Sequence, residues 1–236
     1  MAMLTGASLK GEAQTLKNIL NTLQGSNNSQ SGSLTNSQVV SGLKEALRIG
    51  ANNAANKLSE TDGFFRNAAV KILMPPEVAQ VEKTLRSVGM GSIVDKAILS
   101  MNRAAEDAAK KAAPIFVDAI TSMTLQDGFS ILNGGQNAAT NFLRGKTSAA
   151  LSSAFRPVVQ QSLEKVGATA MWKTVFTTYN KLPLVAKKVN PDLSSYVVER
   201  ALDGMFYSIA QEELKIRTDP AAQVTNLLKQ VFGNKK

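Results

Sequence analysis

The chain has 236 residues, 44% of them hydrophobic, and its 27 Lys and Arg against 18 Asp and Glu give a formal net charge of +9. It contains neither cysteine nor histidine, which excludes disulfides, thiol nucleophiles, zinc–thiolate centres and every triad that uses an imidazole base. No run of about 18 uninterrupted apolar residues occurs, so no helix is predicted to span a bilayer.

Residues 1–33 are predicted to form a short helix followed by a flexible linker. The apolar side chains of this helix lie on one side and are Leu16, Ile19, Leu20 and Leu23. The linker is rich in Gly, Ser, Asn and Gln and has almost nothing to bury. Residues 34–233 are expected to fold as a single all-helical domain, and 234–236 to form a tail.

The apolar residues of the domain recur at helical spacing from its first segment. A helix over 34–59 can be capped by Thr35, Asn36 or Ser37. A short helix over 63–74 is expected to end at the Pro75–Pro76 pair, because a residue that precedes proline disfavours the helical conformation. The next helix restarts at these prolines and ends near Gly91.

Later helices are bounded by prolines and glycines in the same way. The segment 92–124 carries a stripe of small residues, and Pro114 should kink or break it. The pair Gly134–Gly135 breaks the segment that follows. Further helices are predicted over 136–146, 147–167, 168–183, 191–219 and 220–233, with Asp192 or Ser194 near the start of the 191–219 helix. The class is therefore all-α, a multi-helix bundle of about nine to eleven helices with no significant sheet.

Gly145, Lys146 and Thr147 imitate the end of a phosphate-binding loop. The full motif needs a glycine at position 140, which is Thr140 here, and a preceding strand, which the pattern does not contain. We interpret the tripeptide as a helix end at Gly145, with Thr147 or Ser148 capping the next helix. No nucleotide, other cofactor or metal is expected.

Glu199, Asp203 and Tyr207 lie four residues apart and should share one face of the 191–219 helix. Two carboxylates and a phenol could bind a hard cation or exchange protons. The simpler interpretation is a polar stripe beside an apolar one. These three residues are the only catalytic candidates that the sequence offers.

We interpret two further patterns, the adjacent acidic pairs and the aromatic residues, as features of the fold rather than of a site. The adjacent pairs Glu106–Asp107 and Glu212–Glu213 point in different directions on a helix and are expected to be solvated. The aromatic residues are predicted to form core, with an apolar ligand cavity between helices as the alternative. The methionines that could line such a cavity are Met90, Met101, Met123, Met171 and Met205.

Several segments resemble one bacterial family, known as domain of unknown function 4197. They are ALRIGANNAANKLSETDGFF, ILMPPE, GFSILNGGQNAATNFLR and ERALDGMFYSIAQEELKIRTDPAAQVTNLLKQVFG. The resemblance runs from about Leu34 to Gly233. It implies no catalytic residues. Because similar proteins often carry an export or lipoprotein signal, it implies a periplasmic or envelope location if such a segment has been removed here, and otherwise a cytoplasmic one.

These observations favour a non-enzymatic envelope protein that binds a lipid-like or anionic molecule, or another envelope protein. One alternative is a carboxylate-dependent hydrolase, with or without assistance from a metal, that uses Glu199, Asp203 and Tyr207. Another is a helical assembly or scaffold protein. The lysines and arginines are scattered rather than clustered, so specific nucleic-acid binding is not expected.

Overall fold

The computed structural model describes residues 35–181, 188 and 192–218. The chain divides into two units, residues 1–34 and 35–236, and every described helix belongs to the second. The segments predicted as the N-terminal helix and linker, as the 220–233 helix and as the tail lie outside the described residues. The domain boundaries therefore stay predictions.

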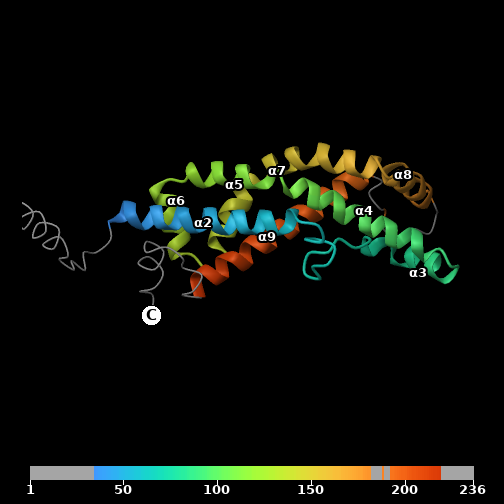
Figure 1. Ribbon diagram of the computed structural model, residues 1–236, viewed down its shortest axis with the longest axis horizontal. Coiled ribbons are helices and arrows are strands. Elements are labelled where there is room, and N and C mark those ends of the chain that lie inside the picture. The colour runs from blue at the N-terminus through green and yellow to red at the C-terminus, as the bar shows by residue number, and fades with distance from the viewer. Residues whose placement is uncertain (1–34, 182–187, 189–191, 219–236) are drawn as a thin grey trace, which may run out of the picture. The chain divides into compact units, whose positions relative to one another are not determined.

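The all-α class is confirmed, because the described residues contain eight α-helices, one 3-10 helix and no strand. The predicted nine to eleven helices are slightly more than the described residues contain. Figure 1 shows their arrangement. In chain order they are α2 (Asn36–Ser59), η1 (Pro76–Val78), α3 (Ala79–Ser87), α4 (Gly91–Ala109), α5 (Ala112–Thr121), α6 (Leu125–Asn133), α7 (Ala138–Glu164), α8 (Ala168–Tyr179) and α9 (Leu193–Thr218).

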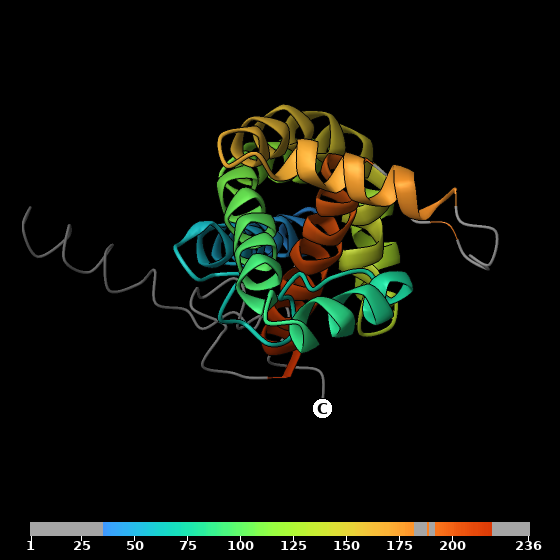
Figure 2. The same ribbon diagram turned by 90° about the vertical axis from the view of Figure 1, so that its right-hand side faces the viewer.

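The core forms where α9 packs against α7, α2 and α4, and Figure 2 shows α9 with these helices around it. Phe116 of α5 meets Phe206 of α9 edge to face, with ring centroids 6.0 Å apart. The small buried residues of α4, such as Ala104 and Ala108, let neighbouring helices approach closely. Gly204 of α9 serves the same end, since a Cβ there would lie 2.7 Å from the ring of Phe64.

Most predicted boundaries follow from local signals. Thr35 caps α2 in a reciprocal capping box with Gln38. The segment 92–124 breaks after Ala109, because the ring of Pro114 would clash with the carbonyl four residues earlier. Asp192 accepts a hydrogen bond of 3.1 Å from the backbone N–H of Ser195 at the start of α9.

The predicted helix end at Gly145 is wrong, because α7 continues through the tripeptide. Leu143 and Leu151 are fully buried on either side of it and hold the helix in place. The hydroxyl of Thr147 donates back to the Leu143 carbonyl at 2.7 Å instead of capping a new helix. Two predicted helices are therefore one, and the backbone N–H groups of the tripeptide are engaged within it, which leaves none to cradle a phosphate.

The predicted helix over 63–74 is also wrong, because this segment forms turns and then irregular chain. Its backbone groups find partners on α4 instead. The carboxylate of Glu106 accepts from the N–H groups of Phe64 and Phe65, each at 3.1 Å. The side-chain amide of Asn102 bonds both the N–H and the carbonyl of Ile72, at 2.9 and 2.8 Å. Long-range partners thus replace helical hydrogen bonds.

Candidate ligand cavity

The three sequence candidates on α9 lie on its exposed surface. The Glu199 side chain is 68% exposed and lies 2.7 Å from the guanidinium of Arg200. Asp203 is held by Arg200 at 3.2 Å and by Arg144 at 3.5 Å. Tyr207 is exposed as well. Both carboxylates thus already have cationic partners in a solvated setting.

Asp203 and Tyr207 also line an open groove of about 490 Å³ between α9 and residues 69–76. Its remaining polar side chains are engaged rather than poised for chemistry. Tyr196, whose hydroxyl donates to the Leu73 carbonyl at 2.8 Å, is partly buried, and this burial raises its pKa. Among the described residues, no group of three or more acidic side chains could hold a metal ion.

Two acidic residues expected in solvent are buried instead. Glu106 pairs with Arg103 at 2.6 Å while it holds the turn at Phe64 and Phe65. Glu213 of α9 accepts from the first N–H groups of α7 and pairs with Arg217. Glu106 thus links α4 to the turn, and Glu213 links α9 to α7, so both residues have a structural role. The sequence signal was weak: each carboxylate has an arginine three or four residues away on its helix.

A mostly apolar hollow is lined by residues of α3, α4 and α8. Figure 2 shows these three helices at one end of the unit. The volume of the hollow is about 480 Å³, within the range of about 300–1,000 Å³ that is usual for small-molecule sites. It opens to solvent. The apolar residues that line it are Met74, Val81, Leu85, Met90, Ile93, Val94, Ala97, Met101, Val166, Ala168, Trp172, Phe176 and Leu193.

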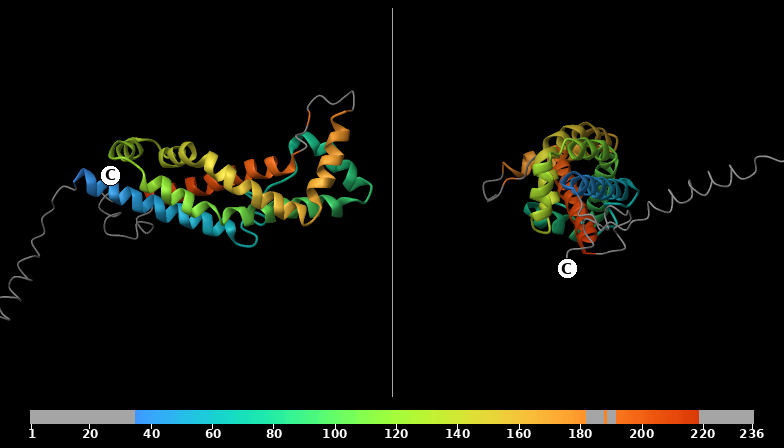
Figure 3. Two further views of the ribbon diagram at one scale, coloured as in Figure 1. Left: turned by 90° about the horizontal axis from the view of Figure 1, so that it is seen from above. Right: turned by 90° about the vertical axis from the view of Figure 1, so that its left-hand side faces the viewer.

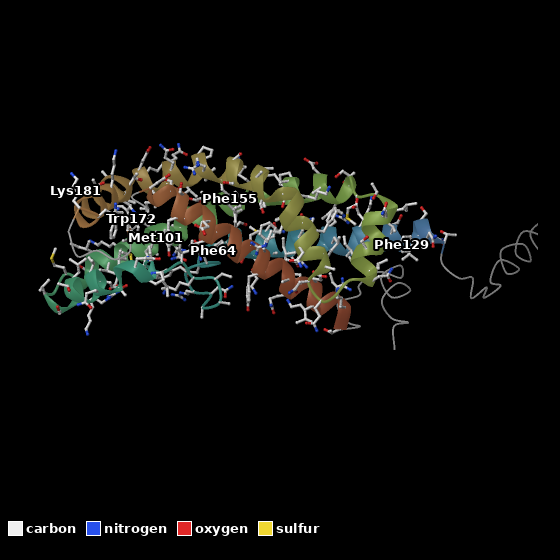
Figure 4. All side chains as sticks on the ribbon, turned by 180° about the vertical axis from the view of Figure 1, so that it is seen from behind. Phe64, Met101, Phe129, Phe155, Trp172 and Lys181 are labelled. Carbon is white, nitrogen blue, oxygen red and sulfur yellow. The ribbon has the colours of Figure 1, made fainter. Side chains whose placement is uncertain are left out.

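Trp172 contributes a buried aromatic ring to this cavity. Its indole contacts Phe176 with ring centroids 4.3 Å apart and stacks on Tyr196 at 6.1 Å. Figure 4 shows Trp172 beside Met101 of α4 at this end of the unit. Trp172 is the only tryptophan of the chain, so its fluorescence reports on the cavity alone.

Helix α3 forms the opposite wall and has no buried residue of its own. Its apolar side chains Val81 and Leu85 face the cavity and remain half-exposed. The described elements that it chiefly contacts are η1 and α4, and Figure 3 shows it at the same end of the unit as α8. An apolar helix face that covers a hollow instead of a core keeps its side chains partly in contact with water. A further apolar group in the hollow would remove that contact.

Only three polar residues line the cavity: Glu82, Lys96 and Ser100. Arg86 holds Glu82 at 3.0 Å and Asp95 at 2.8 Å. Ser100 donates to the Lys96 carbonyl at 2.8 Å. The Lys96 ammonium has no ion-pair partner within the described part of the chain, so it is the charge available to an incoming anion.

The methionines predicted from the sequence to line a cavity do so only in part. Met90 and Met101 line it. Met123 and Met205 are buried in the core, and the side chain of Met171 lies outside the described residues. The sequence did not single out α3 and Lys96, because their role depends on which helices meet.

The comparison with known families gives one match, which spans residues 33–233 and therefore nearly the whole chain. The chain belongs to the family described as Protein of unknown function (DUF4197). No curated protein and no solved structure matches it significantly. Within the described part of this DUF4197 chain, no helix combines the length and apolarity needed to cross a bilayer.

Proposed function

We propose that this protein binds an amphipathic, lipid-like molecule with an anionic head, without catalysing a reaction on it. The observation that carries the proposal is the open apolar cavity of about 480 Å³ between α3, α4 and α8. The acyl or alkyl chain would lie against Trp172 and Phe176. It would supply the apolar contacts that Val81 and Leu85 of α3 lack.

The charge at the cavity supports an anionic head over a cationic one. Lys96 lines the cavity and its ammonium has no ion-pair partner among the described residues, whereas Glu82 is already paired with Arg86. An ion pair at a partly exposed site contributes up to about 1 kcal/mol, which is about fivefold in affinity. Lys96 would therefore set the preference for head-group charge, and burial of the chain would supply most of the affinity.

Hydrolysis by Glu199, Asp203 and Tyr207 is not favoured. A general acid–base pair needs carboxylates in different environments, so that one is protonated and the other ionised. Here Glu199 is exposed, Asp203 is half-exposed, and both carboxylates are paired with arginines. No contact of the described residues favours a scaffold role either.

We also propose an envelope location, which fits a lipid-like ligand and a net charge of +9. Fractionation of the native bacterium would test it. We expect the protein with the periplasmic or membrane fraction, and recovery from the cytosol alone would contradict the proposal.

Quenching of Trp172 fluorescence tests the binding proposal. Bromine quenches indole only at close contact, so a brominated long-chain fatty acid should quench Trp172 saturably. With unbranched acids, each added methylene should strengthen binding by about 0.8 kcal/mol, about fourfold, until the cavity is full. Quenching that is weak and does not saturate would refute the proposal.

A matched pair of variants separates cavity binding from adsorption elsewhere. Ala97→Phe fills the hollow and should abolish saturable quenching. Ala119→Phe adds the same ring at a half-buried site on α5, away from the cavity, and should leave quenching unchanged. Lys96→Glu should weaken binding of fatty acids and strengthen binding of alkylammonium ions.

A further inference from the structure

The rim of the cavity exposes apolar side chains on two separate loops. Val88 and Met90 lie between α3 and α4 and are 64% and 43% exposed. Val166, between α7 and α8, is 59% exposed. Met90 and Val166 both line the cavity, so the two loops flank the same opening. Three large apolar side chains in solvent at one mouth indicate a contact surface.

Two exposed lysines are neighbours in sequence of residues that line the cavity. Lys165 precedes Val166, and Lys173 follows Trp172 on α8. Neither forms an ion pair with a described residue. Of the nearby acids, Glu82 and Asp95 share the one guanidinium of Arg86, and Asp107, which interacts with Lys165, is paired with Lys110. Glu164 accepts from the neutral amide of Gln160 and keeps its negative charge. With Lys96 included, the rim presents more free positive than free negative charge.

We propose that this rim docks on an anionic membrane surface, with Val88, Met90 and Val166 dipping into the head-group layer. The proposal rests on the binding function above and adds where the ligand enters and leaves. Opposite charge would bring the lysines to the lipid phosphates. The open cavity would then face the bilayer, so an acyl chain could pass between them without crossing water.

A membrane fits this surface better than a protein partner does. A stable protein interface buries at least about 1,000 Å² with a well-packed apolar centre. Three separated side chains on loops do not provide such a centre. Shallow insertion combined with several basic residues is sufficient for reversible attachment to anionic lipid.

Co-sedimentation with vesicles tests the docking. The full chain should sediment with vesicles of equimolar phosphatidylglycerol and phosphatidylcholine, and not with pure phosphatidylcholine. Added salt should release it. The variant Lys165→Gln plus Lys173→Gln should lose about fivefold in partitioning per lysine, on the order of 25-fold together. Val88→Ser plus Val166→Ser should also weaken binding, with less effect on its salt dependence.

Lys111→Gln plus Lys146→Gln is the matched control, because both lysines are exposed and neither forms an ion pair with a described residue. Lys146 lies about 28 Å before Lys165 along α7. This variant has the same net charge as the test variant and should sediment like the unmodified chain. An equal loss in both variants would mean that overall charge alone attracts the protein, and would overturn the proposal.

The soluble brominated acid separates this proposal from the binding function. A chain whose Trp172 is quenched saturably but that does not sediment with anionic vesicles would overturn docking and leave the cavity intact. A chain that sediments as described but shows no saturable quenching would refute the cavity and leave a purely peripheral membrane contact, which contradicts the proposed role in ligand transfer.

Discussion

Removal of the Glu213 carboxylate should destabilise the protein more than removal of any exposed acid on α9. This side chain reaches from α9 to the start of α7. It accepts from the N–H groups of Ala139 and Thr140 at 3.1 and 2.9 Å and from the Thr140 hydroxyl at 2.8 Å. It also pairs at 2.8 Å with Arg217, which donates to the Ile131 carbonyl at 3.1 Å. One carboxylate therefore joins α6, α7 and α9.

The size of the effect follows from what Glu213→Ala leaves behind. Two buried N–H groups and a hydroxyl lose their acceptor, at about 1–3 kcal/mol for a buried polar group left unsatisfied. Breaking a buried ion pair on one side costs about 3–5 kcal/mol. Arg217 retains the Ile131 carbonyl and some solvent, so we expect a total near 3–4 kcal/mol. For a domain of this size, the melting temperature should fall by about 10 °C.

Urea unfolding followed by far-ultraviolet circular dichroism measures this difference. Glu199→Ala removes an exposed carboxylate from the same helix and should change the free energy of unfolding by less than about 1 kcal/mol. Glu213→Gln keeps an acceptor without the charge and should fall between the two. If Glu213→Ala unfolds within about 1 kcal/mol of the unmodified protein, the cap on α7 is not stabilising as described.

Three further outcomes follow from the described contacts. Glu199→Ala plus Asp203→Ala should leave the melting temperature almost unchanged, and a large fall would show that these groups are buried and paired. In chemical denaturation, Gly145→Ala should stabilise the protein by about 0.5–1 kcal/mol, because the added Cβ meets open space. Gly204→Ala should destabilise it by about 1–3 kcal/mol, because the added Cβ meets an aromatic ring. The opposite order would contradict the packing. Hydrogen bonds from the backbone and hydroxyl of the α6 cap lower the pKa of Asp127, so its stabilising effect is complete above the unfolded pKa of about 3.9 and is lost as the pH falls through the lower folded pKa. Thermal melts of Asp127→Asn should thus differ from those of the unmodified protein at neutral pH and converge with them in strong acid, and a constant difference would contradict this cause.

The helices were predictable wherever local chemistry decides them. Apolar spacing gave the class, and short-range signals such as the cap at Thr35 and the break before Pro114 gave several boundaries. These signals act within a few residues. The same reasoning failed at Gly145, where burial of Leu143 and Leu151 outweighs the intrinsic cost of glycine in a helix.

The prediction of a helix over 63–74 failed for the same physical reason, because long-range contacts outweigh local preference. The helical pattern of this segment competes with acceptors and donors on α4, namely Glu106 and Asn102, which lie about 30–40 residues away. A single sequence does not reveal that pairing. Glu106 and Glu213 were expected in solvent because an acidic pair on a helix usually is. Their burial is explained by the turn at Phe64 and Phe65, which Glu106 holds, and by the start of α7, which Glu213 holds.

An apolar cavity was among the predicted alternatives, but the residues that line it were not predicted as a set. Scattered methionines and aromatics indicated that helices could leave an apolar hollow between them. Met101 and Trp172 line it, whereas Met205 and Phe155 belong to the core. Their residue types do not distinguish these two groups. The meeting of α3, α4 and α8 does.

A crystal of the protein grown with a brominated fatty acid would locate the bound chain through the anomalous scattering of bromine. We predict a bromine peak between α3 and α4, in contact with the indole of Trp172. Bromine bound only outside this hollow, with side chains of α3 and α8 closed over it, would contradict the ligand cavity described above.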